Sequence, residues 1–229
     1  MRILFAFFNV RFKQRYSTLL IFVTLAVGTS GLCHAQDSGA FAKLDFGGNT
    51  YIEVPRNWTY LDENLRKHLN TGGEAVARLA GITPNPGENV ILVASNAYTS
   101  FRTPSATLRL SVRRGDGPTQ VEMRQLAKLP KMELVQLLTS VAEETRRAMI
   151  GIDGVKSIKT VDTRVATNQE IVCMFFAFET DTSDGAKLSQ TYVCPLGNRS
   201  VKLSTSYRKS EAMLFRPVIE YVWQSLRVN

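Results

Sequence analysis

The segment 170–207 constrains the fold most strongly, because it places two cysteines on either side of a turn. Its sequence runs EIVCMFFAFE, a polar turn at 181–186, KLSQTYVC, a second turn at 195–199, and then SVKLSTSY. A continuous apolar run, followed by two segments of mixed apolar and polar residues that turns separate, is typical of strands, so we predict three consecutive antiparallel strands. Cys173 lies in the first strand and Cys194 in the second.

A pairing that sets Cys173 opposite Cys194 has further support from the residues around it. The chain then reverses at Ser183-Asp184-Gly185, which are residue types that favour turns. Facing residues lie about 4.5 Å apart at Cα, within the range of a disulfide. The predicted cross-strand pairs are Phe175–Tyr192, Ala177–Gln190 and Glu179–Leu188 on one face, and Met174–Val193 and Phe176–Thr191 on the other. The alternative is a pair of buried free thiols.

The first 35 residues have the order of a secretory signal peptide. Four basic residues precede an apolar run at 19–27, and small residues then lead to Cys33-His34-Ala35. We predict cleavage after Ala35, a flexible lead-in at 36–43 and a single domain at 44–229. The apolar run is shorter than the ~20 residues that a membrane-spanning helix needs, so an uncleaved membrane anchor is the less favoured interpretation.

Removal of this leader changes both the charge and the cysteine count. Of 28 lysines and arginines the leader takes four, which leaves 24 against 20 acidic residues and a net charge of +4. A modest and dispersed charge does not favour a nucleic-acid-binding protein. Cys33 is lost with the leader, and an even pair of cysteines is what an exported protein with one disulfide would have. We therefore predict a periplasmic or secreted protein.

The rest of the chain predicts further strands and helices. A hairpin is predicted from 44–46 and 51–54, and strands from 90–94, 106–113 and 155–165. The run at 90–94 is wholly apolar, so we expect that strand to be covered on both faces. Helices are predicted at 62–69 and 74–80, after a Thr119/Glu122 capping box, after Pro130 with a cap at Gly151, and in a last segment that Ser210 caps. The main part of that last helix is expected to begin at Pro217, with an apolar stripe of Val218, Val222, Trp223 and Leu226.

Antiparallel strands interrupted by helices predict an α/β sandwich of the α+β class. The chain also resembles the PsbP-like sandwich family in its VPRNW strand end, its helix pair in mid-chain and the final stretch SYRKSEAMLFRPVIEYVWQSLRV. This resemblance covers most of 44–228. The resemblance implies an antiparallel sheet flanked by helices on both faces and a role in binding or assembly, and it assigns no site residue.

The search for reactive residues yields no catalytic or cofactor-binding set. His68 is the only histidine that remains after cleavage, and it lies in the charged stretch RKHLN without a Gly-x-Ser-x-Gly elbow elsewhere. We interpret it as a surface residue. Asp181 and Asp184 lack the twelve-residue loop of a calcium site, so we predict no metal ligand and no cofactor.

A group of basic residues is expected at strand ends and on solvated strand faces. If these side chains converged, they would meet an anionic partner or lipid headgroups. Dispersed solubilising charge is the favoured interpretation. The residues are Arg113, Arg114, Lys202, Arg208 and Lys209.

These observations predict an exported, non-enzymatic binding or assembly protein. Its partner would be a protein or an envelope component, bound through a sheet edge or a helix face, with no role for nucleic acid. Two alternatives remain: a hydrolase that uses carboxylates alone, such as Asp62 or Glu63 with Glu74, and a membrane-tethered protein with an uncleaved leader. Membrane association of the mature form is left open but is not predicted.

Overall fold

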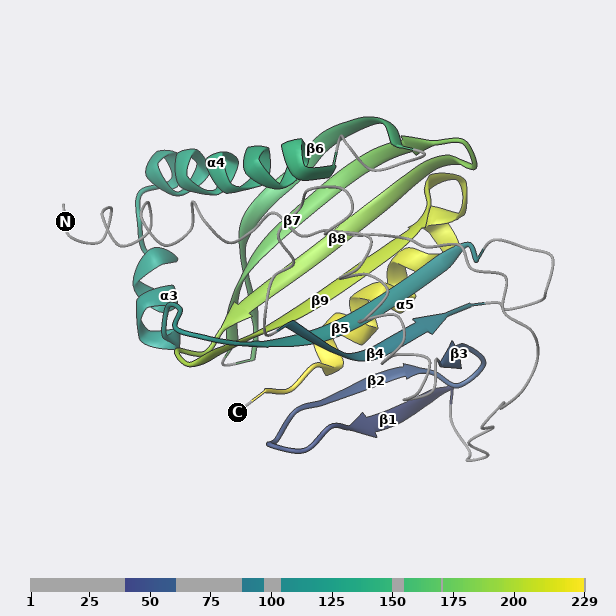
Figure 1. Cartoon of the computed structure of the whole chain (residues 1–229), viewed down its shortest axis with the longest axis horizontal. Coiled ribbons are helices and arrows are strands. Elements are labelled where there is room, and N and C mark those ends of the chain that lie inside the picture. Colours follow the sequence, from purple (N-terminus) through teal and green to yellow (C-terminus); the bar gives the residue numbers. More distant parts are fainter. Residues whose placement is uncertain (1–39, 61–87, 97–103, 150–154, 170, 229) are drawn as a thin grey trace.

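The computed structural model describes residues 40–60, 88–96, 104–149, 155–169 and 171–228. The signal peptide, the helices predicted at 62–69 and 74–80, and the cap at Gly151 lie outside these residues. The described part is an α/β/α sandwich, as predicted (Figure 1).

A seven-stranded antiparallel sheet forms the middle layer of the described part. From one edge to the other it contains β3 (Thr59–Tyr60), β4 (Glu88–Ser95), β5 (Ala106–Arg114), β9 (Arg199–Arg208), β8 (Gly185–Pro195), β7 (Ile171–Thr182) and β6 (Val155–Asn168). The sheet is out of sequence order at its centre, because β9 pairs with both β5 and β8.

Helices α3 (Gln120–Leu126) and α4 (Lys131–Met149) pack on β7 and β6 at one face of this sheet. The Thr119/Glu122 capping box is present, and the Pro130 carbonyl accepts the first hydrogen bond at the start of α4. Met123, Leu126, Leu138, Val141 and Ala142 supply the buried side of the two helices.

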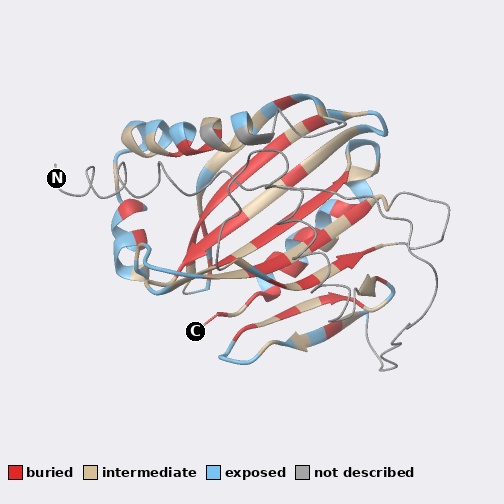
Figure 2. Ribbon diagram, in the orientation of Figure 1, coloured by how far each residue is buried: buried red, intermediate tan, exposed pale blue. Residues whose placement is uncertain are grey.

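The opposite face is covered by α5 (Ala212–Ser225) and by a two-stranded sheet of β1 (Phe41–Asp45) and β2 (Tyr51–Pro55). This is the hairpin predicted from 44–46 and 51–54, although its first strand begins at Phe41. The larger of the two cores lies beneath these elements. Figure 2 shows buried residues along the central strands and exposed residues on the outer side of α4.

The two cysteines form the predicted disulfide at the start of the β7–β8 pairing. The sulfur atoms are 2.10 Å apart, the Cα atoms 4.3 Å, and both residues are fully buried. All five predicted cross-strand pairs are present, and β8 begins at Gly185, whose φ of +101° a side chain would disfavour.

The last helix differs from the prediction at its start. Ser210 lies in a short 3-10 turn (Lys209–Glu211), the helix begins at Ala212 without a side-chain cap, and Pro217 lies inside it. Phe215 is buried in the core one turn before the predicted apolar stripe, and Ile219 is buried next to the first residue of that stripe. Tertiary packing of these side chains therefore outweighs the local preference of proline for a helix start.

The end of α5 is fixed to β6 and β2. The buried Asn168 amide donates to the carbonyl oxygens of Trp223 at 2.7 Å and Leu226 at 3.0 Å. Ser225 Oγ accepts a hydrogen bond of 2.9 Å from the Glu53 backbone N–H. Carbonyl groups at a helix end have no partner within the helix, so Asn168 supplies donors that the helix itself lacks.

Strand β4 is present, but it is not covered evenly on both faces as the apolar run predicted. Val90, Leu92 and Ala94 are buried, whereas Ile91 and Val93 are half-buried. In the described part β3 is the only strand outside β4, and it pairs with β4 over two residues. The position of β4 near the sheet edge accounts for the difference.

We expect the disulfide to contribute about 3 kcal/mol to the free energy of unfolding, because it restricts a loop with a sequence separation of 21 residues in the unfolded chain. The variant C173A/C194A should unfold at a lower urea concentration than the oxidised protein. Because the substitutions also remove buried atoms, the wild-type protein unfolded under reducing conditions is the control. If reduction leaves the urea midpoint unchanged, the disulfide does not stabilise the fold.

Candidate functional site

The basic residues singled out in the sequence fall into two separate groups. Arg113 and Arg114 pair with the first residues of β9, whereas Arg208 is at its far end. A strand of this length spans roughly 30 Å, so the two groups do not form one patch. Arg208 lies 3.8 Å from Glu211 and Lys209 lies 2.7 Å from Glu179, which balances the charge at the far end.

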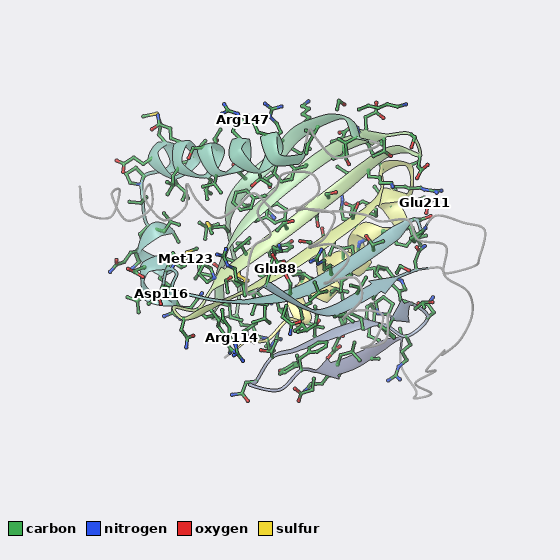
Figure 3. The ribbon with its side chains drawn as sticks, in the orientation of Figure 1. Glu88, Arg114, Asp116, Met123, Arg147 and Glu211 are labelled. Carbon is green, nitrogen blue, oxygen red and sulfur yellow. A yellow bond between two sulfur atoms is a disulfide. The ribbon has the colours of Figure 1, made fainter. Side chains whose placement is uncertain are left out.

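The near end of β9 contains a pocket of about 600 Å³. Its lining side chains come from the ends of β5 and β9, from the turn before β9 and from the start of α3, and they are Arg114, Gln120, Leu196, Asn198 and Arg199. Figure 3 shows Arg114 and Asp116 at this end of the sheet. The sequence prediction included Arg114 but missed the other four residues.

Two glycine-containing turns build the rim of the pocket by pairing with each other. The Gly115 N–H donates to the Asn198 carbonyl at 2.9 Å, and the Gly117 N–H donates to the Gly197 carbonyl at 2.7 Å. Gly115 and Gly197 have φ angles of +137° and +82°, which favour glycine at both positions. These turns fix the strand ends that carry the arginines.

Two arginines face each other across this end of the sheet. Arg114 on β5 is the direct cross-strand partner of Arg199 on β9. Arg199 Nη2 donates to the carbonyl of Gly48 in the β1–β2 turn at 3.4 Å. The pairing therefore brings two positively charged side chains to the same end of the sheet.

Gln120 forms the wall of the pocket and attaches α3 to the sheet. Its side-chain amide donates to the carbonyls of Pro195 at 2.6 Å and Val172 at 3.1 Å, and its oxygen accepts from the Val172 N–H at 2.8 Å. Val172 and Pro195 are the residues next to the two disulfide cysteines. Proline has no N–H to donate, so the Gln120 amide replaces the missing ladder hydrogen bonds at this position.

A second polar cluster surrounds Glu88 on β4. Its carboxylate lies 2.6 Å from Lys202 Nζ, 2.8 Å from Ser111 Oγ and 3.9 Å from Arg109 Nη2. Burial opposes ionisation of Glu88, but the two cations and the hydroxyl together hold its pKa below the ordinary value. These partners favour the ionised carboxylate. Because Lys202 is paired with Glu88, its charge does not add to the predicted group of basic residues.

The remaining predicted residues do not form a site in the described part of the chain. Asp184 lies 3.9 Å from Lys187 Nζ, and within the described ranges no cluster of three or more histidine, cysteine, aspartate or glutamate residues is placed to hold a metal ion. His68, Asp62, Glu63 and Glu74 lie outside the described residues, so the carboxylate hydrolase remains an untested alternative. In the same ranges, no helix combines the length and the apolar character needed to cross a membrane.

Known structures resemble this sandwich, although no family profile and no curated protein matches the sequence. The solution structure of cyanobacterial PsbP (CyanoP) from Synechocystis sp. PCC 6803 is similar with a TM-score of 0.52 at 9% identity, over 87% of this chain and 98% of that chain.

Two further structures are similar at lower scores. The Ran-binding protein Mog1p of Saccharomyces cerevisiae has a TM-score of 0.41 at 11% identity, over 83% of this chain and 96% of its own. LpqN of Mycobacterium tuberculosis, described as involved in cell envelope biogenesis, has a TM-score of 0.39 at 13% identity, over 80% of this chain and 86% of its own.

The seven-stranded sheet, the helices on both its faces and the likeness to CyanoP together define a PsbP-like α/β/α sandwich. The resemblance stated from the sequence is confirmed for the fold.

We expect Gln120→Glu to lower the free energy of unfolding by about 2 kcal/mol, because it removes both amide donations and sets a carboxylate against two carbonyl oxygens. Urea denaturation at neutral pH measures the change. Gln125→Glu, at an exposed position of the same helix, is the matched control and should change stability by a few tenths of a kcal/mol. Equal losses in the two variants would contradict the role of Gln120.

Glu88 should make the stability of the protein depend on pH in the acid range. Its folded-state pKa is lowered, so its contribution is complete above the ordinary value of 4.5 and is lost as pH falls through the folded pKa. Glu88→Gln should lower the free energy of unfolding by about 2 kcal/mol at pH 7, because Lys202 and Arg109 lose their shared partner. Below pH 4.5 the stability of this variant should depend less on pH than the stability of the wild-type protein. Thermal unfolding across this range, with exposed Glu220→Gln as the control, measures both effects; a wild-type acid profile in Glu88→Gln would contradict them.

Proposed function

We propose that the protein is a non-enzymatic binding or assembly protein of the periplasm or the extracellular space, which acts on a protein or another envelope component. The observation that carries this proposal is the open pocket at the near end of β9. Exposed Arg114 and Asn198 and the half-buried Arg199 line it. Accessible cations on a rigid strand end suit the recognition of an anionic partner.

The disulfide supports the proposed location. It is fully buried, and its cysteines lie next to Met174 and Val193, the first cross-strand pair of β7 and β8. Structural disulfides of this kind form and persist outside the reducing cytoplasm. The predicted signal peptide at 1–35 points to the same compartment.

The polar groups near the pocket support binding rather than catalysis. The Gln120 amide is held by three hydrogen bonds to the backbone, and the Glu88 carboxylate is held by Lys202, Arg109 and Ser111. A general base needs a lone pair that faces the substrate and a pKa near the working pH. The lowered pKa of Glu88 and its bound neighbours suit a structural role instead.

A site-specific photo-crosslinker tests whether the pocket contacts a partner. With the crosslinking residue in place of Asn198, illumination of cells that export the full-length chain should produce one discrete covalent adduct. The matched control places the same residue at Val161, which is 53% exposed on the outer strand β6 and lies away from the pocket. No adduct at 198, or the same adducts from both positions, would count against a binding role for this end of the sandwich.

A further inference from the structure

We propose that the pocket between α3 and the paired ends of β5 and β9 binds a phosphoryl group, with Arg114 and Arg199 as its two charged ligands. This inference rests on the proposed function, because it names the chemistry that the same pocket would recognise. It goes further in specifying a doubly charged anion.

The first support is the pairing of the two arginines. Residues directly opposite in an antiparallel pair project to the same face, with Cβ atoms about 5 Å apart, so both guanidinium groups extend from neighbouring points into one pocket. An anion between them would be attracted by both guanidinium groups. A phosphate monoester carries close to two negative charges at neutral pH and therefore matches two arginines, whereas a carboxylate matches one.

The second support is the set of donors at the pocket. A guanidinium group presents its N–H donors in a planar fork that fits two oxygens of one phosphate. Asn198, exposed on the opposite rim, adds a side-chain amide. Gln120 is committed to the backbone of Val172 and Pro195, so it serves as a fixed wall and not as a ligand.

The third support is the way in which Arg199 is positioned. The Gly48 carbonyl holds one of its terminal nitrogens at 3.4 Å, and a Cβ at position 48 would lie 3.5 Å from the other. That distance is an ordinary contact, so it is the φ of +56° that favours glycine at position 48 in this turn. A ligand arginine that is partly held in place loses less conformational entropy when the anion binds.

The dimensions of the pocket indicate more than a single free ion. A volume of about 600 Å³ lies within the range of small-molecule sites, and Leu196 adds an apolar wall. The phosphoryl group would therefore be carried by a larger molecule, either a soluble phosphate monoester or a lipid with a monoester headgroup such as phosphatidic acid. Asp116 is exposed in the turn after Arg114 and is the acid closest in sequence to the pocket arginines.

The exported protein, labelled for NMR, tests the site with inorganic phosphate as the probe. Phosphate should shift the backbone signals of Gly115 and Asn198, and acetate at equal concentration should shift them less. Arg114→Gln and Arg199→Gln should each weaken phosphate binding about tenfold, the usual cost of losing one charge-assisted contact. Asp116→Asn should strengthen binding, because it removes a nearby negative charge.

Arg124→Gln is the matched control, because it removes the same charge from an exposed position of α3 that does not line the pocket. Circular dichroism melts of all variants show whether each one is folded. If Arg124→Gln lost as much affinity for phosphate as Arg114→Gln, the loss would reflect the net charge of the protein and not the pocket, and the proposal would be overturned. No phosphate-dependent shift in the folded wild-type protein, or equal shifts with acetate, would also overturn it.

Vesicle flotation distinguishes the two sources of the phosphoryl group. Phosphatidylcholine vesicles with and without phosphatidic acid are compared for the wild-type protein and for Arg114→Gln. Phosphatidic-acid-dependent flotation that Arg114→Gln abolishes supports a headgroup ligand, and phosphate binding without flotation supports a soluble ester. If phosphate does not bind but the crosslink at 198 still forms, the pocket contacts a partner through other chemistry, and the binding function stands without this inference.

Discussion

The pairing of β7 with β8 is the interaction on which the rest of this sandwich depends. The disulfide closes one end of the pairing, and the turn at Ser183-Asp184-Gly185 closes the other. Between them the two strands supply Phe175 and Tyr192 to one core and Met174, Phe176 and Val193 to the other. Because these two strands contribute side chains to both cores, their pairing sets the spacing of the layers on either side, where side chains pack at near-crystalline density.

The same pairing also determines where the pocket lies. Pro195 ends the hydrogen-bond ladder one residue beyond Cys194, and the Gln120 amide continues it from the first residue of α3. The helix is thereby attached at the point where β8 leaves the sheet and where the chain turns into β9. The gap that remains between this helix start and the ends of β5 and β9 is the arginine pocket.

The features that could be predicted from the sequence are those that local patterns encode. The Cys173–Cys194 register, the β1–β2 hairpin and the Thr119 capping box each depend on residues close together in the chain. The pocket could not be predicted in this way, because Arg114 and Arg199 become neighbours only through the β5–β9 pairing. The predicted start of α5 was wrong for a related reason. Phe215 packs in a core formed with distant strands, and the local preference of Pro217 for a helix start takes no account of that contact.

The position of β9 at the centre of the sheet has a consequence for how the chain is assembled. Strand β5 is made well before β9, yet the two pair along their whole length, and β9 also completes the outer half of the sheet through β8. During synthesis, β4–β5 and β6–β7–β8 can pair only as two separate pieces with open edges until β9 is made. Strand β9, the last strand in the sequence, joins the two pieces. The described sheet therefore stays incomplete until nearly the whole chain has been synthesised, and its open edges are exposed to aggregation and proteolysis until then.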